Sequence, residues 1–265
     1  MKFFFTILFF LSALTSNAQQ SNFRGHNNYV VPPLPSEILK TGLVMNLDAG
    51  DPLSYTGSGN IWTDLTGNGN NGAILSPNSY IAANGGYFQL SVGNGISLPA
   101  TSTNFNFTSD DFAIEIWAKP IAAYQTLISL NSLSGGYSAL RLESGQSDGQ
   151  ISLLQSAAFT TWDVNLSNIQ VDFIRNNWHQ ILLSRISNNL IIYVDGVSKI
   201  NTTSASTLKS NTPGSSFNTI GSMTSVSSYS SYSGIIAIVR VYKGNGLTAN
   251  QALENYKAVK TRFGL

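Results

Sequence analysis

Short apolar segments separated by clusters of Gly, Asn and Ser make up most of the chain. The alternation of apolar and polar residues is clearest in FAIEIWAKP, which begins at Phe112. Apolar residues at every second position share one face of a strand, and Glu115 and Trp117 fall on the other face. The segment therefore predicts a strand with one face in a hydrophobic core. The residues of that face are Phe112, Ile114, Ile116 and Ala118.

Two further apolar runs predict a hairpin. Residues 178–186 (WHQILLSRI) and 190–196 (LIIYVDG) are separated by Ser and two Asn residues, and Asn tolerates the positive φ of tight turns. Asp195 and Gly196 predict a second tight turn into a strand over 197–201. Further strands are expected at 43–48, 87–90, 126–130, 137–143, 150–155, 217–221 and 235–242. So many strands favour two packed sheets over one open sheet.

One helix is expected near the carboxyl terminus. Thr248 and Gln251 fit a capping box, and apolar residues follow at helical spacing. These residues are Ala252, Leu253, Tyr256, Val259 and Phe263. Residues 202–233 are rich in Ser and Thr and indicate a long loop or a weak edge strand.

The amino terminus predicts export. Lys2, an apolar run over 3–14 and the triplet Ser16, Asn17, Ala18 are typical of a secretory signal peptide over 1–18. The run is shorter than the roughly 20 residues of a membrane-spanning helix, so no membrane insertion is expected. Residues 19–41 contain three prolines and predict a linker or extended arm, and 42–265 form the predicted domain. The mature protein is expected to be secreted, either extracellular or periplasmic. Because it has no cysteine and therefore no disulfide, its hydrophobic core is expected to stabilise the fold.

The composition limits the classes of binding partner that can be expected. Charged residues make up 10% of the chain and the formal net charge is +1. Such a chain offers neither a basic surface for nucleic acid nor a polybasic patch for membranes.

Four segments in order resemble laminin-G-like domains of the concanavalin A-like lectin/glucanase superfamily. They are the run from Gly42 to Ile74, FAIEIWAKP, the hairpin NNWHQILLSRISNNLIIYVDGV and the ending that starts GIIAIVRVYKGNG. The resemblance implies an all-β fold, a jelly-roll β-sandwich of two antiparallel sheets with a short C-terminal helix. It leaves function open, because this sandwich carries lectins, carbohydrate-binding modules, glycosidases and adhesion modules.

Catalytic chemistry has little support in the residues. Hydrolases similar to this family place carboxylates as Glu-x-Asp-x-Glu on one strand, and none of the four glutamates of this chain lies in such a pattern. Glu115 is a lone carboxylate on its strand. A glycosidase would need two carboxylates facing one cleft, and Asp163, Asp172 or Glu143 would have to supply them. His179 is interpreted as structural, and His26 lies in the expected linker. Zinc would need more His or Cys ligands. We therefore expect that the protein is not an enzyme.

Calcium is the ion that the composition permits, because it takes oxygen ligands. MNLDAGD and WTDLTGNGNNG supply the candidate ligands Asp48, Asp64, Asn68 and Asn70, and the resemblance implies a structural calcium near such loops. In contrast, Ala237 stands where many relatives carry an acidic residue. The alternative is a compact turn between two short strands, in which Asp64 binds backbone amides.

Carbohydrate binding would depend on exposed rings that stack on sugars. Trp162, Tyr229 and Tyr232 lie in polar, loop-like surroundings and are the candidates, whereas Trp62, Trp117 and Trp178 are expected in the core. An alternative for Trp162 is a ring that covers a sheet edge. The sequence thus favours a secreted, non-catalytic module that binds carbohydrate or a cell-surface glycoconjugate. The alternative is a structural or adhesive module that binds an extracellular protein, and a glycoside hydrolase is the least supported.

Overall fold

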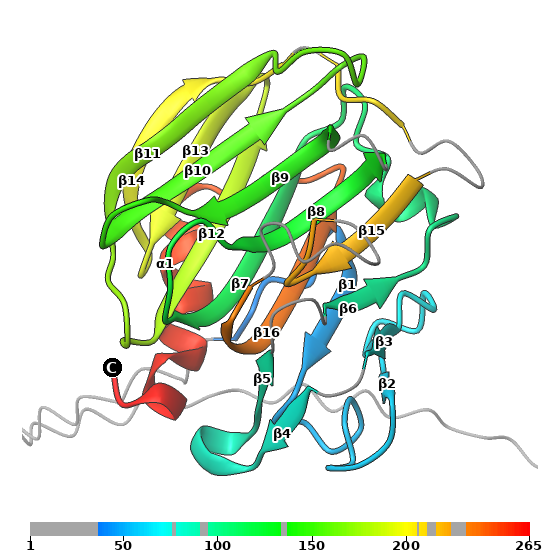
Figure 1. The fold of residues 1–265 in the computed structure, drawn as a ribbon, viewed down its shortest axis with the longest axis vertical. Coiled ribbons are helices and arrows are strands. Elements are labelled where there is room, and N and C mark those ends of the chain that lie inside the picture. Colours follow the sequence, from blue (N-terminus) through cyan, green and yellow to red (C-terminus); the bar gives the residue numbers. More distant parts are fainter. Residues whose placement is uncertain are drawn as a thin grey trace, which may run out of the picture. The chain divides into compact units, whose positions relative to one another are not determined.

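Two antiparallel sheets packed face to face form the described part of the chain (Figure 1). The computed structural model describes residues 37–75, 78–90, 95–133, 137–205, 207–210, 216–223 and 232–265. The signal peptide and most of the linker predicted from the sequence lie outside these residues. The jelly-roll sandwich expected from the alternation of apolar residues is confirmed. No helix in the described ranges is long and apolar enough to cross a membrane.

Sheet A carries the C-terminal helix. Its strands, in spatial order, are β14 (Val197–Thr203), β13 (Asn189–Val194), β12 (His179–Ile186), β7 (Phe112–Pro120), β16 (Gly234–Lys243), β5 (Tyr87–Leu90) and β4 (Ser79–Ile81). β1 (Leu43–Asp48) pairs with the second half of β16. The long strands β7 and β16 therefore form the centre of this sheet.

Sheet B lies opposite. Its strands, in spatial order, are β11 (Val164–Phe173), β10 (Gly149–Gln155), β9 (Ser138–Ser144), β8 (Thr126–Leu133), β15 (Ser216–Ile220), β6 (Ile96–Leu98), β3 (Gly72–Ile74) and β2 (Ile61–Trp62). Two short 3₁₀ helices, η1 (Ala83–Gly85) and η2 (Thr103–Phe105), lie in connections between strands. The pairing of β2 with β3 confirms the strand, turn and strand expected from WTDLTGNGNNGAI.

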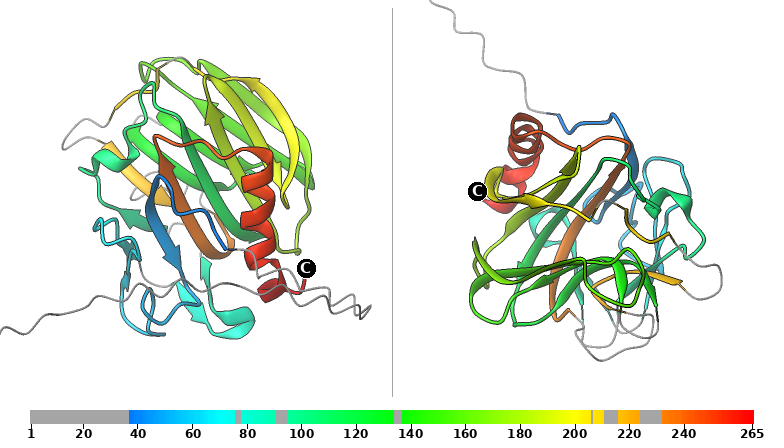
Figure 2. Two further views of the ribbon diagram at one scale, coloured as in Figure 1. Left: turned by 180° about the vertical axis from the view of Figure 1, so that it is seen from behind. Right: turned by 90° about the horizontal axis from the view of Figure 1, so that it is seen from above.

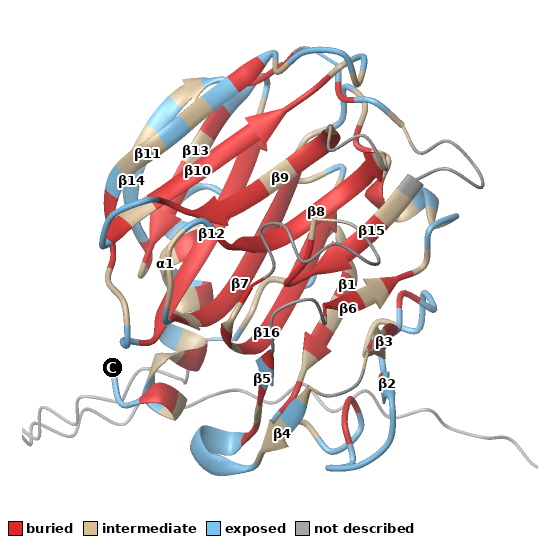
Figure 3. Ribbon diagram, viewed as in Figure 1, coloured by how far each residue is buried: buried red, intermediate tan, exposed pale blue. Residues whose placement is uncertain are grey.

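The core fills the space between the sheets (Figure 3). The predicted inner face of β7 is confirmed, because its four alternate apolar residues all belong to the core and are fully buried. Leu140, Leu142 and Leu153 meet them from sheet B. Trp62 is also fully buried, with its ring 4.9 Å from that of Phe88. Removing such apolar area from water supplies most of the folding free energy.

The outer face of sheet A is covered by α1 (Ala249–Val259) and η3 (Lys260–Phe263), as Figure 2 shows from behind. The capping box of Thr248 and Gln251 is present. Trp117 points outward from β7 and stacks its ring on those of Tyr256, at 5.7 Å, and Phe263, at 4.9 Å. The face of β7 opposite the main core is therefore also apolar and buried.

The predicted hairpin turns are confirmed. Ser187 and Asn188 between β12 and β13, and Asp195 and Gly196 between β13 and β14, all have positive φ. The sequence did not predict β11. Its pairing with β10 is interrupted by two register shifts, and Asn168 and Asp172 have positive φ, so its apolar residues do not alternate regularly.

Candidate functional site

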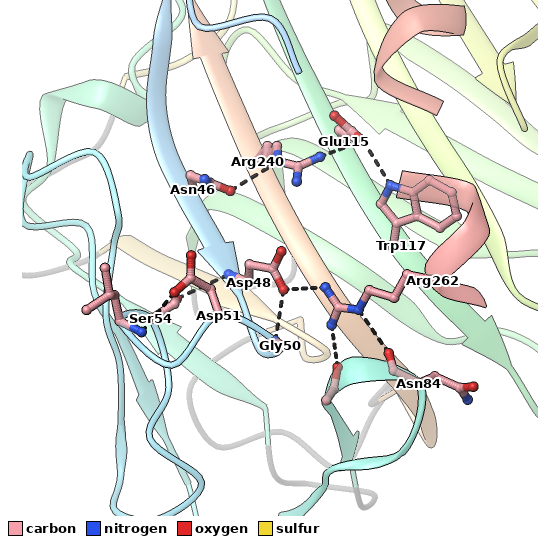
Figure 4. A network of polar contacts seen from close by, with 12 residues as sticks. Asn46, Asp48, Gly50, Asp51, Ser54, Asn84, Glu115, Trp117, Arg240 and Arg262 are labelled. Atoms are coloured by element: carbon pink, nitrogen blue, oxygen red, sulfur yellow. Dashed lines mark hydrogen bonds and ion pairs between the residues drawn. The ribbon is translucent and has the colours of Figure 1, made fainter. Parts of the chain in front are cut away.

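The carboxylate of Glu115 lies fully buried under the C-terminal helix (Figure 4). Its Oε1 accepts hydrogen bonds from Trp117 Nε1 at 2.9 Å, Gln180 Nε2 at 2.9 Å and Arg240 Nη1 at 3.0 Å. Its Oε2 accepts one from Asn255 Nδ2 at 2.8 Å, which ties α1 to β7. A carboxylate with four donors and no exposed surface stabilises the fold and does not reach a substrate.

Tyr242 belongs to the same buried network. Its hydroxyl oxygen accepts a hydrogen bond from Asn255 Nδ2 at 2.9 Å. Burial, and to a smaller extent the Glu115 carboxylate, raises the pKa of Tyr242 well above its ordinary value. The phenol therefore stays neutral in the folded protein at pH values where it ionises in the unfolded chain.

This shift predicts a loss of stability in alkali. Above pH 10 the unfolded chain releases the Tyr242 proton and the folded protein keeps it, so the free energy of unfolding falls as pH rises. One such group contributes a slope of about 1.4 kcal/mol per pH unit. Urea unfolding between pH 8 and 11 measures it. Tyr242→Phe should flatten the slope near pH 11, where the unfolded phenol is almost fully ionised, by about that amount, and an unchanged slope would contradict the assignment.

On sheet B, a cluster of aromatic and charged side chains lies along β9. The neighbours of Arg141 on either side, Leu140 and Leu142, belong to the core, so Arg141 projects from the outer face. Its guanidinium lies 4.9 Å from the centre of the Trp162 ring. The ring of Tyr137 is 5.0 Å from that of Trp162. We call Tyr137, Arg141, Glu143 and Trp162 the Trp162 cluster.

Charge pairing fixes this cluster. Arg141 Nε lies 3.0 Å from Glu143 Oε1, and Thr126 Oγ1 donates to the same carboxylate oxygen at 3.1 Å. Burial lowers the pKa of Arg141, and the nearby Glu143 opposes that shift. Trp162 is half-buried and sits in the connection between β10 and β11. The cluster thus combines a partly exposed ring with ordered polar groups.

The other two candidate rings differ. Tyr229 lies outside the described residues. Tyr232 is fully buried in the main core, and the interpretation of it as an exposed stacking ring is wrong. A Cβ added at Gly234 would lie 2.4 Å from Tyr232 Cζ, so the missing side chain at Gly234 leaves room for the ring. The Ser-rich sequence around Tyr232 gave no sign that its ring packs in the core beside Gly234.

The Asp64 carboxylate forms the centre of the turn between β2 and β3. Its Oδ1 accepts hydrogen bonds from the amides of Asn46 at 2.9 Å and Thr66 at 3.0 Å, and its Oδ2 accepts one from the Asn70 amide at 3.1 Å. Asn68 and Asn70 both donate from Nδ2 to the Val44 carbonyl. This hydrogen-bond pattern is the one expected for a compact turn in which Asp64 binds backbone amides.

Asp48 lies at the end of β1. Its Oδ1 binds Arg262 Nη1 at 2.5 Å and the amide of Gly50 at 2.9 Å (Figure 4). Donors thus engage oxygens of both acidic candidates, and no group of three or more His, Asp or Glu in the described ranges is arranged to hold a metal. The arrangement does not fit a calcium centre, because Ca²⁺ needs six to eight oxygen ligands. Calcium binding stays a prediction.

The remaining titratable candidates are held by local partners. Asp163 Oδ2 accepts from the Ala157 amide at 2.7 Å, and Asp172 pairs with Lys199 at 2.9 Å. His179 Nδ1 lies 2.7 Å from Asp195 Oδ2, and its Nε2 lies 3.2 Å from the Ile174 carbonyl oxygen. His179 thus links β12 to the turn after β13, which is a structural arrangement.

Known structures share this fold. Domain 4 of an extracellular arabinanase of Geobacillus stearothermophilus, in complex with arabinotriose, is 19% identical with a TM-score of 0.57, covering 81% of this chain and 98% of that domain. Trypanosoma rangeli sialidase in complex with sialic acid is 15% identical with a TM-score of 0.59, covering 83% of this chain and 33% of the sialidase. The receptor-binding domain of botulinum neurotoxin type G is 16% identical with a TM-score of 0.56, covering 82% of this chain and 51% of that domain.

These likenesses show the fold alone, and this chain spans only about a third of the sialidase and half of the toxin domain. The fold occurs in enzymes and in non-catalytic lectin modules. A search of the curated proteins finds no match. The family described as the concanavalin A-like lectin/glucanases superfamily matches residues 90–251, which is more than half of the sequence. The chain therefore belongs to the concanavalin A-like lectin/glucanases superfamily.

Proposed function

We propose that this protein is a secreted, non-catalytic module that recognises carbohydrate or a cell-surface glycoconjugate through the Trp162 cluster. The observation that carries the proposal is the half-buried Trp162 ring beside Tyr137 and Arg141. An accessible aromatic face stacks on a pyranose or furanose ring, and adjacent charged groups orient its hydroxyls. Domain 4 of the arabinanase, which shares the fold, is in complex with arabinotriose.

Secretion and the lack of catalysis rest on separate observations. The amino-terminal sequence over 1–18 supports export. Glu115 is fully buried and Glu143 is paired with Arg141, so neither glutamate is placed as a free general acid. These arrangements support a binding role for the sandwich.

A glycan array tests the proposal. The protein is applied once in calcium and once in a chelator. Binding to a defined glycan class supports recognition, and its loss in the chelator supports dependence of that binding on a divalent cation. Absence of binding in both conditions would contradict the proposal and favour a structural or adhesive module whose partner is an extracellular protein.

Trp162→Ala should weaken binding to the strongest glycan of the array. Stacking of one ring supplies about 1–3 kcal/mol in comparable base-stacking sites, which corresponds to roughly 5- to 150-fold in the dissociation constant. Isothermal titration calorimetry measures the change. Tyr124→Asn is a matched control, since Tyr124 is half-exposed and its amide bonds the Gly145 carbonyl, at the end of β9 opposite to Tyr137. Equal affinities for Trp162→Ala and the wild type would place the site elsewhere.

A further inference from the structure

A pocket of about 420 Å³ opens between the end of β1 and the end of the C-terminal helix. Asn46, Asp48, Asp51 and Arg240 line it together with Arg262 and Lys40, and we call it the β1 pocket. Its volume lies within the range of small-ligand sites, roughly 300–1,000 Å³. None of its lining residues belongs to the Trp162 cluster.

Several hydrogen-bonding groups of this pocket are unused. Arg240 is 3% exposed. It donates hydrogen bonds from Nε to Asn46 Oδ1 at 3.1 Å and from Nη1 to Glu115 (Figure 4). Its third guanidinium nitrogen, Nη2, bonds no described residue. Asn46 Nδ2 likewise has no partner in the described ranges. Asp48 Oδ2 and Asp51 Oδ2 are free acceptors there, because only the Oδ1 of each is bonded. A donor of a pocket-lining residue that has no protein partner favours a ligand that accepts its hydrogen bond.

The charges of the pocket are already matched. Glu115 neutralises Arg240, and Asp48 neutralises Arg262. Lys40 lies 3.8 Å from Glu37, which leaves Asp51 without a cationic partner in the described part of the chain. An anionic ligand would therefore meet an unpaired carboxylate and no unpaired cation. A neutral polar ligand meets no such repulsion.

We propose that the β1 pocket binds one neutral sugar residue or polyol, as a second site separate from the Trp162 cluster. Each hydroxyl of such a ligand donates one hydrogen bond and accepts others. Arg240 Nη2 and Asn46 Nδ2 donate to hydroxyl oxygens, and Asp48 Oδ2 and Asp51 Oδ2 accept from hydroxyl hydrogens. The proposal does not depend on the function proposed for the Trp162 cluster.

Two conservative variants test the contacts. Asp51→Asn keeps the Oδ1 that accepts the Leu53 amide at 2.8 Å and removes the free acceptor. Asn46→Asp keeps the acceptor for Arg240 Nε and removes the free donor. Asp172→Asn on β11, in the other sheet, is the matched control. The bond to the Asp51 carboxylate involves a charged group and is worth about 1.5–3 kcal/mol, so Asp51→Asn should weaken binding about tenfold or more. The neutral bond from Asn46 is worth about 0.5–1.5 kcal/mol, so Asn46→Asp should weaken binding about two- to tenfold.

The measurement is a titration of the protein with free D-glucose, D-galactose, D-mannose and L-arabinose, followed by amide chemical shifts in nuclear magnetic resonance. The proposal predicts that at least one sugar shifts amides in the 46–51 region, that both pocket variants weaken this effect, and that Asp172→Asn and Trp162→Ala do not. No shift there with any of the four sugars, or shifts that both pocket variants leave unchanged, would overturn it. Shifts at the pocket without glycan-array binding would contradict the Trp162 proposal alone.

Discussion

Glu115→Gln is expected to lower the free energy of unfolding by about 3–5 kcal/mol, the range found when one partner of a buried ion pair is removed. The side chains of Glu115 and Arg240 are 0% and 4% exposed, so water cannot replace the lost charge. The variant keeps the shape of the side chain but leaves the Arg240 guanidinium without its counterion. Urea unfolding followed by tryptophan fluorescence measures the loss.

The matched control is Glu254→Gln on the exposed face of α1, where the pair with Lys257 is half exposed. Exposed pairs contribute about 0–1 kcal/mol, so this variant should remain near the wild type. Combining Glu115→Gln with Arg240→Met removes the stranded cation and should destabilise less than the two single variants summed. A loss below about 1 kcal/mol for Glu115→Gln would contradict the role of the buried pair.

Arg185→Leu is expected to destabilise the protein by at least about 3 kcal/mol, because it removes a fully buried guanidinium together with its hydrogen bonds to three carbonyl groups. Arg185 is fully buried and donates from Nε to the Asp110 carbonyl at 3.0 Å, from Nη1 to that of Ala205 at 3.3 Å and from Nη2 to that of Thr108 at 3.0 Å. Its guanidinium also lies 5.3 Å from the centre of the Phe112 ring. The residue thus joins two loops to β12.

Thermal unfolding of Arg185→Leu and Arg175→Leu compares a fully buried with a half-buried arginine. Arg175 is only half-buried, and its side chain donates one hydrogen bond, to the Gln146 carbonyl at 3.0 Å. Its replacement should change stability by less than about 0.5 kcal/mol. Equal losses for the two variants would show that the carbonyl contacts of Arg185 do not stabilise the fold.

Local patterns were sufficient to predict most of the fold. The alternation in β7, the Asn turn between β12 and β13 and the capping box of α1 each involve residues close in sequence. β11 was missed because its register shifts and its left-handed residues, Asn168 and Asp172, break the period of two. Strand prediction from alternation depends on an unbroken pleat.

The side-chain networks were less predictable, because sheet pairing brings distant residues together. Trp162, in the connection between β10 and β11, was recognised from its polar surroundings, but its neighbour Arg141 reaches it from β9. Glu115 was recognised as a lone carboxylate, whereas its partners Arg240 and Asn255 lie 125 and 140 positions away. Arg262, which pairs with Asp48, is 214 positions away. No local pattern carries contacts of that separation.

The indole resonances of the four tryptophans test the proposed recognition most directly. Trp62, Trp117 and Trp178 are 0%, 0% and 8% exposed, whereas Trp162 is only half-buried. The protein is titrated with the strongest glycan of the array, and its indole N–H signals are followed by nuclear magnetic resonance. The account predicts that the Trp162 signal shifts with the glycan while the other three stay in place. A saturating glycan that leaves the Trp162 signal unmoved would contradict it.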